Sequence, residues 1–124
     1  MSVDKIGRSL RVLVVDDEPL IAMGISDMLE DLGHEAVPAY SGQEGLDRLG
    51  SAKFDLVITD QTMPDMTGVA LAREAMKRDS ELVVFLSTGH SEIEDEAGRD
   101  LPCLQKPYAL PDLAALIAAK FGDS

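Results

Sequence analysis

Residues 54–68 read Phe54-Asp-Leu-Val-Ile-Thr-Asp60-Gln-Thr-Met-Pro-Asp-Met-Thr-Gly68. The apolar, β-branched run from Leu56 to Ile58 predicts a strand that is buried on both faces. This strand ends at Asp60, and the loop behind it carries Pro64 and Gly68. A carboxylate at the end of a buried strand is costly unless a metal, a cation or a phosphoryl group compensates its charge. Asp60 is therefore the first candidate site residue.

The composition fits one compact domain. The chain has 124 residues, of which 45% are hydrophobic and 27% are charged, so we expect a single domain over residues 1–124 with its core between 10 and 121. No run approaches the ~20 apolar residues of a membrane span. The first ten residues lack the apolar core of a secretory signal, and we therefore expect a cytoplasmic location.

The charge and the cysteine content exclude several classes of partner and environment. The net charge of −12 argues against direct nucleic-acid binding and against binding to anionic membranes. The lone Cys103 cannot form an internal disulfide, which agrees with a reducing compartment.

Alternating apolar runs and helical signals predict an α/β fold. The expected strands are 11–16, 35–38, 54–60, 82–86 and 102–105. The expected helices are 18–32 (closed by Gly33), 41–50, one from 67 or 68 to about 78, and one opened by Pro111. Residues 90–100 read as a short acidic helix or as a loop. Strands that alternate with helices favour a flavodoxin-like (βα)5 three-layer sandwich, whose parallel five-stranded sheet has the order 2-1-3-4-5.

Every predicted strand except the second ends at or near a polar side chain: Asp16 and Asp17, Asp60, Thr88 and Lys106. Ligands bind at the carboxyl ends of the strands in such a sheet. Three carboxylates in one cleft repel one another, and a hard cation such as Mg²⁺ relieves that repulsion. Lys106 offers a point charge for a phosphoryl oxygen, and the Thr88 hydroxyl can donate to another. Phosphoryl transfer needs positioning and charge neutralisation, so we predict that Asp60 accepts a phosphoryl group.

From Val12 to about Phe121 the chain resembles the receiver domains of two-component response regulators. The resemblance is carried by Asp16-Asp17, by the loop from Thr59 to Gly68, by Thr88-Gly89 and by Lys106-Pro107. It implies a signalling switch, rather than an enzyme, that assists its own phosphorylation and dephosphorylation. A histidine kinase or a histidine phosphotransfer protein would donate to Asp60, and a downstream partner protein would receive the signal.

The resemblance also implies individual roles. Asp16, Asp17, Asp60 and the Thr62 backbone carbonyl would bind Mg²⁺, and Thr88 would turn toward the phosphoryl group. Thr62 and His90 match positions that tune the rate of dephosphorylation, although His90 could equally be an ordinary loop residue. We expect the other histidine, His34, at the surface.

Several departures fall on the family's output face. Cys103 stands at the output position, three residues before the lysine, where an aromatic switch residue is usual; Tyr108 stands where Phe is commoner. The stretch between Thr88 and Lys106 is short by roughly one helical turn. These departures put in doubt the family's usual coupling between Thr88 and an aromatic residue at position 103. They do not affect the predicted phosphorylation site. Some alphaproteobacterial stand-alone receivers share the Thr-Gly and Lys-Pro-Tyr motifs.

Alternatives remain from the sequence alone. A Mg²⁺-dependent phosphohydrolase could also work through an aspartyl phosphate, but Thr62 stands where such enzymes carry a second acid. A flavodoxin-like cofactor binder would need a phosphate-cradling glycine motif, and none appears. Because Ser124 comes soon after the last helix, we expect a stand-alone receiver or an excised receiver of a hybrid sensor kinase. The oligomeric state stays open.

Overall fold

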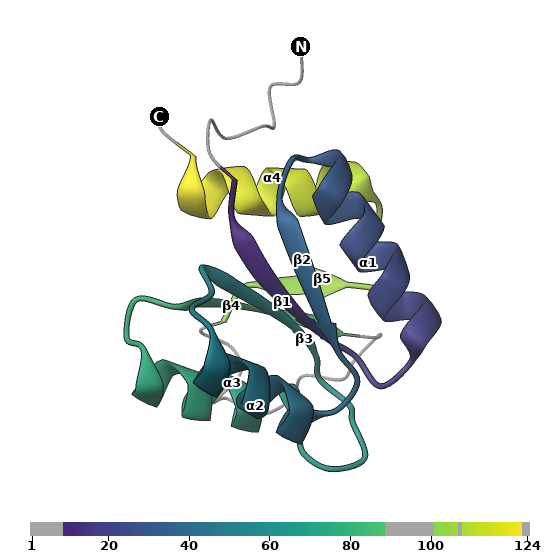
Figure 1. Ribbon diagram of the computed structural model, residues 1–124. Helices are drawn as coiled ribbons and strands as arrows, with labels where there is room; N and C mark the ends of the chain where they lie inside the picture. Colours follow the sequence, from purple (N-terminus) through teal and green to yellow (C-terminus); the bar gives the residue numbers. More distant parts are fainter. Residues whose placement is uncertain (1–8, 89–100, 107, 123–124) are drawn as a thin grey trace.

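The computed structural model describes residues 9–88, 101–106 and 108–122, which form a sheet between two layers of helices (Figure 1). The strands are β1 (Arg11–Val15), β2 (Glu35–Ala39), β3 (Leu56–Asp60), β4 (Val83–Thr88) and β5 (Cys103–Gln105). The helices are α1 (Pro19–Asp31), α2 (Gly42–Ser51), α3 (Gly68–Arg78) and α4 (Leu110–Phe121). None of the helices in these ranges is long and apolar enough to span a membrane. The single domain and the cytoplasmic location stay predictions.

The sheet confirms the predicted topology. All its strands are parallel, in the order β2-β1-β3-β4-β5. The edge position of β2 suits Pro38, which has no N–H to donate to a second neighbour. In the register, Val15 lies beside Thr59, and Asp60 lies beside Ser87. The carboxyl ends of β1, β3 and β4 therefore lie together at one end of the sheet.

The core lies on both faces of the sheet, which explains the uninterrupted apolar runs. Alternate residues of β1 point to opposite faces. Val12 and Val14 pack with α1 and α4, whereas Leu13 and Val15 pack with α2 and α3. Figure 1 shows the same division of the helices into two layers. The three-layer sandwich is therefore confirmed, and the helix or loop expected at 90–100 lies outside the described residues.

Some element boundaries differ from the prediction. β3 begins at Leu56 rather than Phe54, and β4 continues past Leu86 to Thr88. The extension has a physical cause, because Thr88 pairs with Gln105 of β5 and so continues the ladder. Thr88 is consequently the last residue of a central strand rather than part of the loop that follows.

His34 is buried, so its predicted surface position is wrong. Its side chain is 6% exposed, and its Nδ1 accepts a hydrogen bond from the Leu10 N–H at 3.0 Å. Gly33 turns the chain back from α1 with a φ of 92°, a conformation that favours glycine. The imidazole thereby satisfies a buried backbone donor just before β1.

The His34 contact predicts a loss of stability in mild acid. Burial lowers the pKa of His34 from its ordinary value, so the neutral ring is favoured in the folded protein. Its contribution to stability is then full above about pH 6.5, the pKa of an unfolded histidine, and falls as the pH drops below that value. In urea unfolding at about pH 7.5 and about pH 5.5, we expect the wild type to lose more free energy of unfolding than His34→Gln, whose amide does not titrate. Equal losses in the two proteins would contradict this.

Candidate functional site

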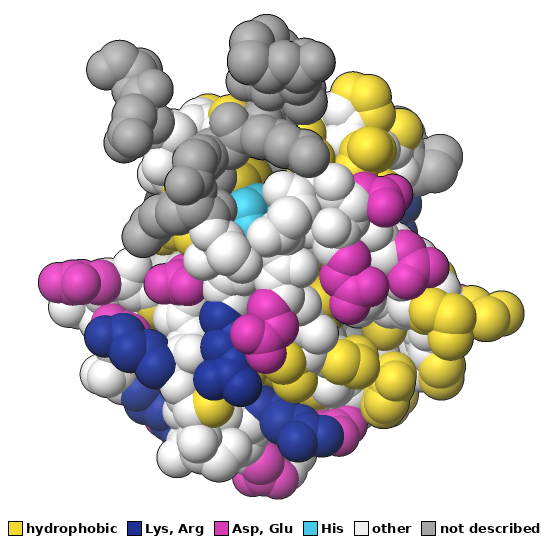
Figure 2. Space-filling model, turned by 45° about the horizontal axis from the view of Figure 1, so that its top comes forward, with side chains coloured by type: hydrophobic (Ala, Val, Ile, Leu, Met, Phe, Trp, Pro, Cys, Tyr) yellow, Lys and Arg dark blue, Asp and Glu magenta, His cyan; other side chains and the backbone are white. Residues whose placement is uncertain are grey.

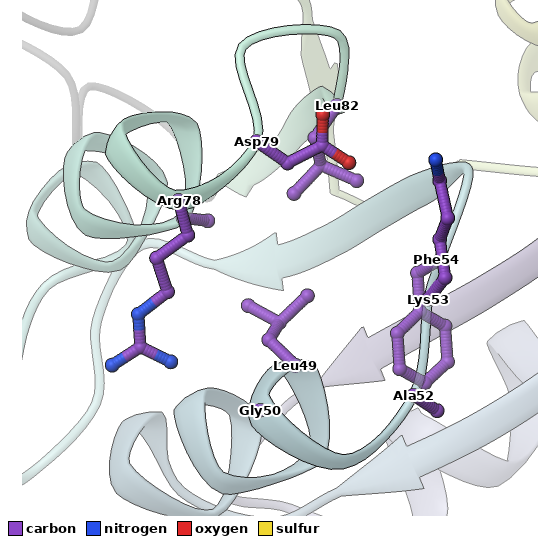
Figure 3. Close-up of a pocket in the computed structure, with 9 residues that line it drawn as sticks. Leu49, Gly50, Ala52, Lys53, Phe54, Arg78, Asp79 and Leu82 are labelled. Carbon is purple, nitrogen blue, oxygen red and sulfur yellow. The ribbon is translucent and has the colours of Figure 1, made fainter.

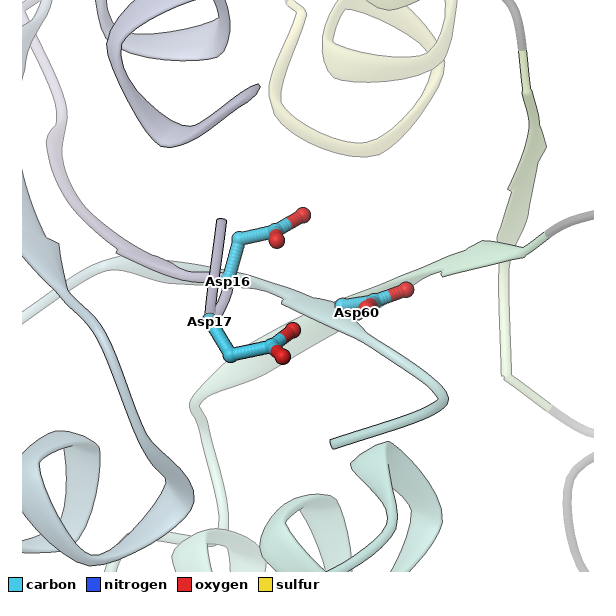
Figure 4. A group of neighbouring side chains, drawn as sticks. All are labelled: Asp16, Asp17 and Asp60. Carbon is cyan, nitrogen blue, oxygen red and sulfur yellow. The ribbon is translucent and has the colours of Figure 1, made fainter. Parts of the chain in front are cut away.

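Three carboxylates meet at the carboxyl ends of β1 and β3 (Figure 4). Asp16 and Asp17 follow β1, and Asp60 ends β3. One oxygen from each lies within 4.8 Å of those of the other two. Asp16 and Asp60 are buried, whereas Asp17 is half-buried. The parallel register of β1 and β3 thus brings together the carboxylates that the sequence predicted would meet.

Lys106 supplies a positive charge to this cluster. Its Nζ lies 2.9 Å from Asp60 Oδ1 and 3.8 Å from Asp16 Oδ2. Lys106 directly follows β5, and its backbone N–H donates to the Thr88 carbonyl oxygen at 2.6 Å. One ammonium against three carboxylates leaves the cluster negatively charged, so the site still attracts a cation.

Asp16 shows where that cation would fit. Its Oδ1 accepts a hydrogen bond from the Glu18 N–H at 2.9 Å, whereas its Oδ2 is the one buried side-chain N or O atom in the described ranges that has no hydrogen-bond partner. Burial raises the pKa of Asp16, and the charge of Asp60 raises it further. A buried carboxylate oxygen that accepts no hydrogen bond is costly, and Mg²⁺ binds through one or two carboxylates together with other oxygens. The donor set therefore fits a hard divalent cation.

The other predicted residues take different positions. Thr88 is buried at the end of β4, on the same sheet edge as Asp60. Thr62 is exposed in the loop after β3. Cys103 lies at the far end of β5 from Lys106; it is exposed, and its Sγ donates to the Leu101 carbonyl oxygen. Partial burial raises the pKa of the Cys103 thiol, which agrees with an unreactive side chain. His90 lies outside the described residues.

The loop after Asp60 is held by contacts that the sequence did not predict. The Gln61 carbonyl oxygen accepts from the Gly68 N–H at 2.9 Å, and its side-chain oxygen accepts from the Val69 N–H at 3.0 Å. A Cβ on Gly68 would lie 2.5 Å from the Asp60 carbonyl oxygen, so only glycine allows this approach. Gly68 was a visible loop signal, whereas nothing in the sequence marked the Gln61 side chain.

The site is defined by charge rather than by volume. A hollow of about 480 Å³ lies at the opposite end of the sheet from the carboxylates, between the ends of α2 and α3 (Figure 3). Its lining includes Lys53 and Phe54, which precede β3, and Arg78 and Asp79 at the end of α3. None of the residues at the carboxylate cluster borders this hollow, so its size does not mark the functional site.

The raised pKa of Asp16 predicts that Asp16→Asn stabilises the metal-free protein at neutral pH. A carboxyl group whose folded-state pKa is raised costs stability once it is ionised, and Asn removes that cost while it can still accept from Glu18. Mg²⁺ should then stabilise the wild type, by about 2.7 kcal/mol at a hundred times its dissociation constant, and the variant much less. Urea unfolding in EDTA and in Mg²⁺ tests this, with the exposed Asp27→Asn as control. A metal-free variant that is less stable than wild type would contradict it.

Comparisons with known proteins agree with this geometry. The family model for the response regulator receiver domain matches residues 12–118. The response regulator receiver protein CpdR of Brucella abortus is 32% identical over 107 residues, which cover 83% of this chain and 89% of that protein. The transcriptional regulatory protein PdtaR of Mycobacterium tuberculosis is 38% identical over 112 residues, and the match covers 86% of this chain but 54% of PdtaR.

Solved structures give the same result. The response regulator TrrA from Thermotoga maritima, in complex with Mg²⁺-BeF, superposes with a TM-score of 0.83 at 30% identity, over 90% of this chain and 98% of that one. TrrA in complex with the histidine kinase ThkA superposes with a TM-score of 0.81, over 91% and 99% of the two chains. The fold, the carboxylate cluster and these matches agree, and the chain belongs to the response regulator receiver domain family.

Proposed function

We propose that Asp60 is the phosphoacceptor of this receiver domain. The observation that carries the proposal is the contact of 2.9 Å between Lys106 Nζ and Asp60 Oδ1 at a buried strand end, beside Asp16 and Asp17. The donor is a phosphorylated histidine of a histidine kinase or a histidine phosphotransfer protein. The structure of TrrA with the kinase ThkA supports this choice of donor.

The transfer needs one bond to form and one to break. An Asp60 carboxylate oxygen attacks phosphorus, and the new O–P bond forms as the P–N bond to the donor imidazole breaks. The imidazole nitrogen keeps the electron pair and takes up a proton. Lys106 neutralises a phosphoryl oxygen, and the Thr88 hydroxyl donates to another; these interactions strengthen as charge reaches the site.

Asp16, Asp17, Asp60 and the Thr62 backbone carbonyl would hold Mg²⁺. When bound, the ion neutralises the oxygens of the incoming phosphoryl group. The structure of TrrA with Mg²⁺-BeF supports this assignment. Asp16 Oδ2, which is buried and accepts no hydrogen bond in the described residues, would gain a partner from such a cation.

The domain also assists its own dephosphorylation. Thr62 is exposed two residues beyond Asp60, and we assign it and His90 to tuning of that step. A phosphohydrolase that acts on external substrates is not favoured, because the family match identifies a signalling module and Thr62 is not an acid.

We place the donor protein on the outer face of α1. Leu20 and Met23 are 81% and 58% exposed there, and Figure 2 shows hydrophobic side chains on the side of the molecule where α1 lies. A hollow of about 270 Å³ is lined by other α1 residues, Tyr108 and Lys106. Because Lys106 borders both this hollow and Asp60, a protein that presents a phosphohistidine to Asp60 would cover the apolar face.

Labelling with a small donor tests the phosphoacceptor. With Mg²⁺ and radiolabelled acetyl phosphate, we expect one acid-stable, base-labile phosphoryl group per chain, because an acyl phosphate is hydrolysed by base. Asp60→Asn should abolish the label, since an amide is not a nucleophile for phosphorus. Asp55→Asn is the matched control, because Asp55 precedes the same strand and accepts from the Arg11 N–H. Labelling of the Asp60 variant at the wild-type level would overturn the assignment.

Comparison of a protein donor with a small donor tests the α1 face. The donor is the kinase or phosphotransfer protein that transfers fastest in a profile of candidates. Met23→Asp should slow that transfer by about tenfold, the effect of about 1.4 kcal/mol lost on docking, and should leave acetyl phosphate labelling unchanged. Met23→Leu keeps the apolar surface and should behave as wild type. Equal transfer rates for the Asp and Leu variants would place the donor elsewhere.

A further inference from the structure

The Asp65 carboxylate joins the loop after β3 to the first turn of α2. Its Oδ1 accepts a hydrogen bond from the Gly42 N–H at 3.1 Å, and its Oδ2 accepts from the Gln43 N–H at 2.9 Å. Gly42 and Gln43 are the first two residues of α2 and lie 22 to 23 positions from Asp65 in the sequence. The contact therefore ties together two segments that are distant in the chain.

The Asp65 carboxylate accepts hydrogen bonds from two of the backbone donors in the first turn of α2. The first four N–H groups of a helix have no partner within the helix. Here the Glu44 N–H donates to the Ser41 side-chain oxygen, and the Gly45 N–H makes the first intrahelical bond, to the Ser41 carbonyl oxygen. The N–H groups of Gly42 and Gln43 are left to Asp65. These hydrogen bonds lower the pKa of the Asp65 carboxyl group, as expected for a negative charge at a helix N-terminus.

A second contact beside Asp65 fixes the same geometry. Met66 packs on Gly42 so closely that a Cβ on Gly42 would lie 2.3 Å from the Met66 Cγ. Met66 also packs against the hydrophobic cluster under α2 and α3. Two adjacent loop residues, one charged and one apolar, therefore dock on the start of α2.

The near end of the same loop is fixed at the sheet. The Gln61 N–H donates to the Ser87 carbonyl oxygen at 3.0 Å, next to Asp60. Residues 62–64 thus connect two fixed points. One is the hydrogen bond of Gln61 to β4, and the other is the pair of hydrogen bonds from Asp65 to α2, which we call the Asp65 clamp. Within this span lies Thr62, whose carbonyl oxygen is the backbone ligand assigned above.

We propose that Asp65 is a positioning residue for the metal site, which holds the Thr62 carbonyl ready for Mg²⁺ by docking the loop on α2. The proposal rests on the proposed function, because it assumes that Thr62 contributes to Mg²⁺ binding. Groups that orient metal ligands without touching the metal affect affinity strongly. A loop released from α2 would have to be ordered when the metal binds, and that entropy cost would weaken binding.

Asp65→Asn tests the clamp, because the amide leaves one backbone N–H of α2 without an acceptor. The Mg²⁺ dissociation constant, measured by NMR titration without any phosphoryl donor, should rise by about tenfold. Amide hydrogen exchange at Gly42 and Gln43 should become faster. Asp47→Asn is the matched control, because it removes an exposed carboxylate from α2 whose described partner is only the Gln43 side chain; it should leave both measurements near wild type.

Two outcomes would overturn the proposal. If exchange at Gly42 and Gln43 becomes faster in Asp65→Asn while the dissociation constant matches that of Asp47→Asn, Asp65 only caps the helix. If neither quantity changes, the clamp does not hold the loop. A wild type that binds no Mg²⁺ would refute the proposed metal site itself, which separates the two failures. Gly42→Ala, which displaces Met66 and keeps Asp65, should weaken Mg²⁺ binding in the same direction and guards against misfolding of the first variant.

Discussion

The main constraint on the site is the repulsion between three carboxylates, which one lysine only partly balances. Two like charges about 4 Å apart repel by about 4 kcal/mol at an effective dielectric constant of 20, which is a large part of the 5–15 kcal/mol that stabilises an ordinary domain. Asp16, Asp17 and Asp60 meet within 4.8 Å, and Lys106 contacts two of them. The parallel sheet, buried on both faces, holds this arrangement against its own repulsion, and the proposed Mg²⁺ would relieve that repulsion.

Hydrogen bonds link the charged site to β4 and to Tyr108, which follows β5. The Thr88 carbonyl oxygen accepts from the Lys106 N–H, so a shift of Lys106 also acts on the end of β4. Next to Thr88, the Ser87 hydroxyl lies 3.5 Å from the Tyr108 hydroxyl, and burial raises the pKa of Tyr108. The hydroxyl of Tyr108 thus contacts β4 at Ser87, whereas Cys103, at the usual aromatic position, is exposed on the edge strand β5.

Much of the fold was predictable because its signals are local. Apolar runs mark strands buried on both faces, and Ser41 and Thr67 cap their helices through contacts three residues away. The meeting of the carboxylates followed from the parallel order alone. The burial of His34 and the clamp by Asp65 were not predictable, since each depends on a partner more than twenty residues away and neither belongs to a periodic pattern. The extension of β4 to Thr88 likewise depends on pairing with β5.

The position of Asp60 at the carboxyl end of the sheet agrees with transfer between two proteins. An enzyme that acts on a small molecule gains from an enclosed pocket, which excludes water and surrounds the substrate. A phosphohistidine on a folded partner must instead reach Asp60 from outside, so the acceptor has to lie at an open sheet edge. The hollow between α2 and α3 lies at the other end of the sheet, so a partner bound there would not reach Asp60. Among the described residues, the fixed charges and the tethered loop around Asp60 are the groups that would position the incoming phosphoryl group.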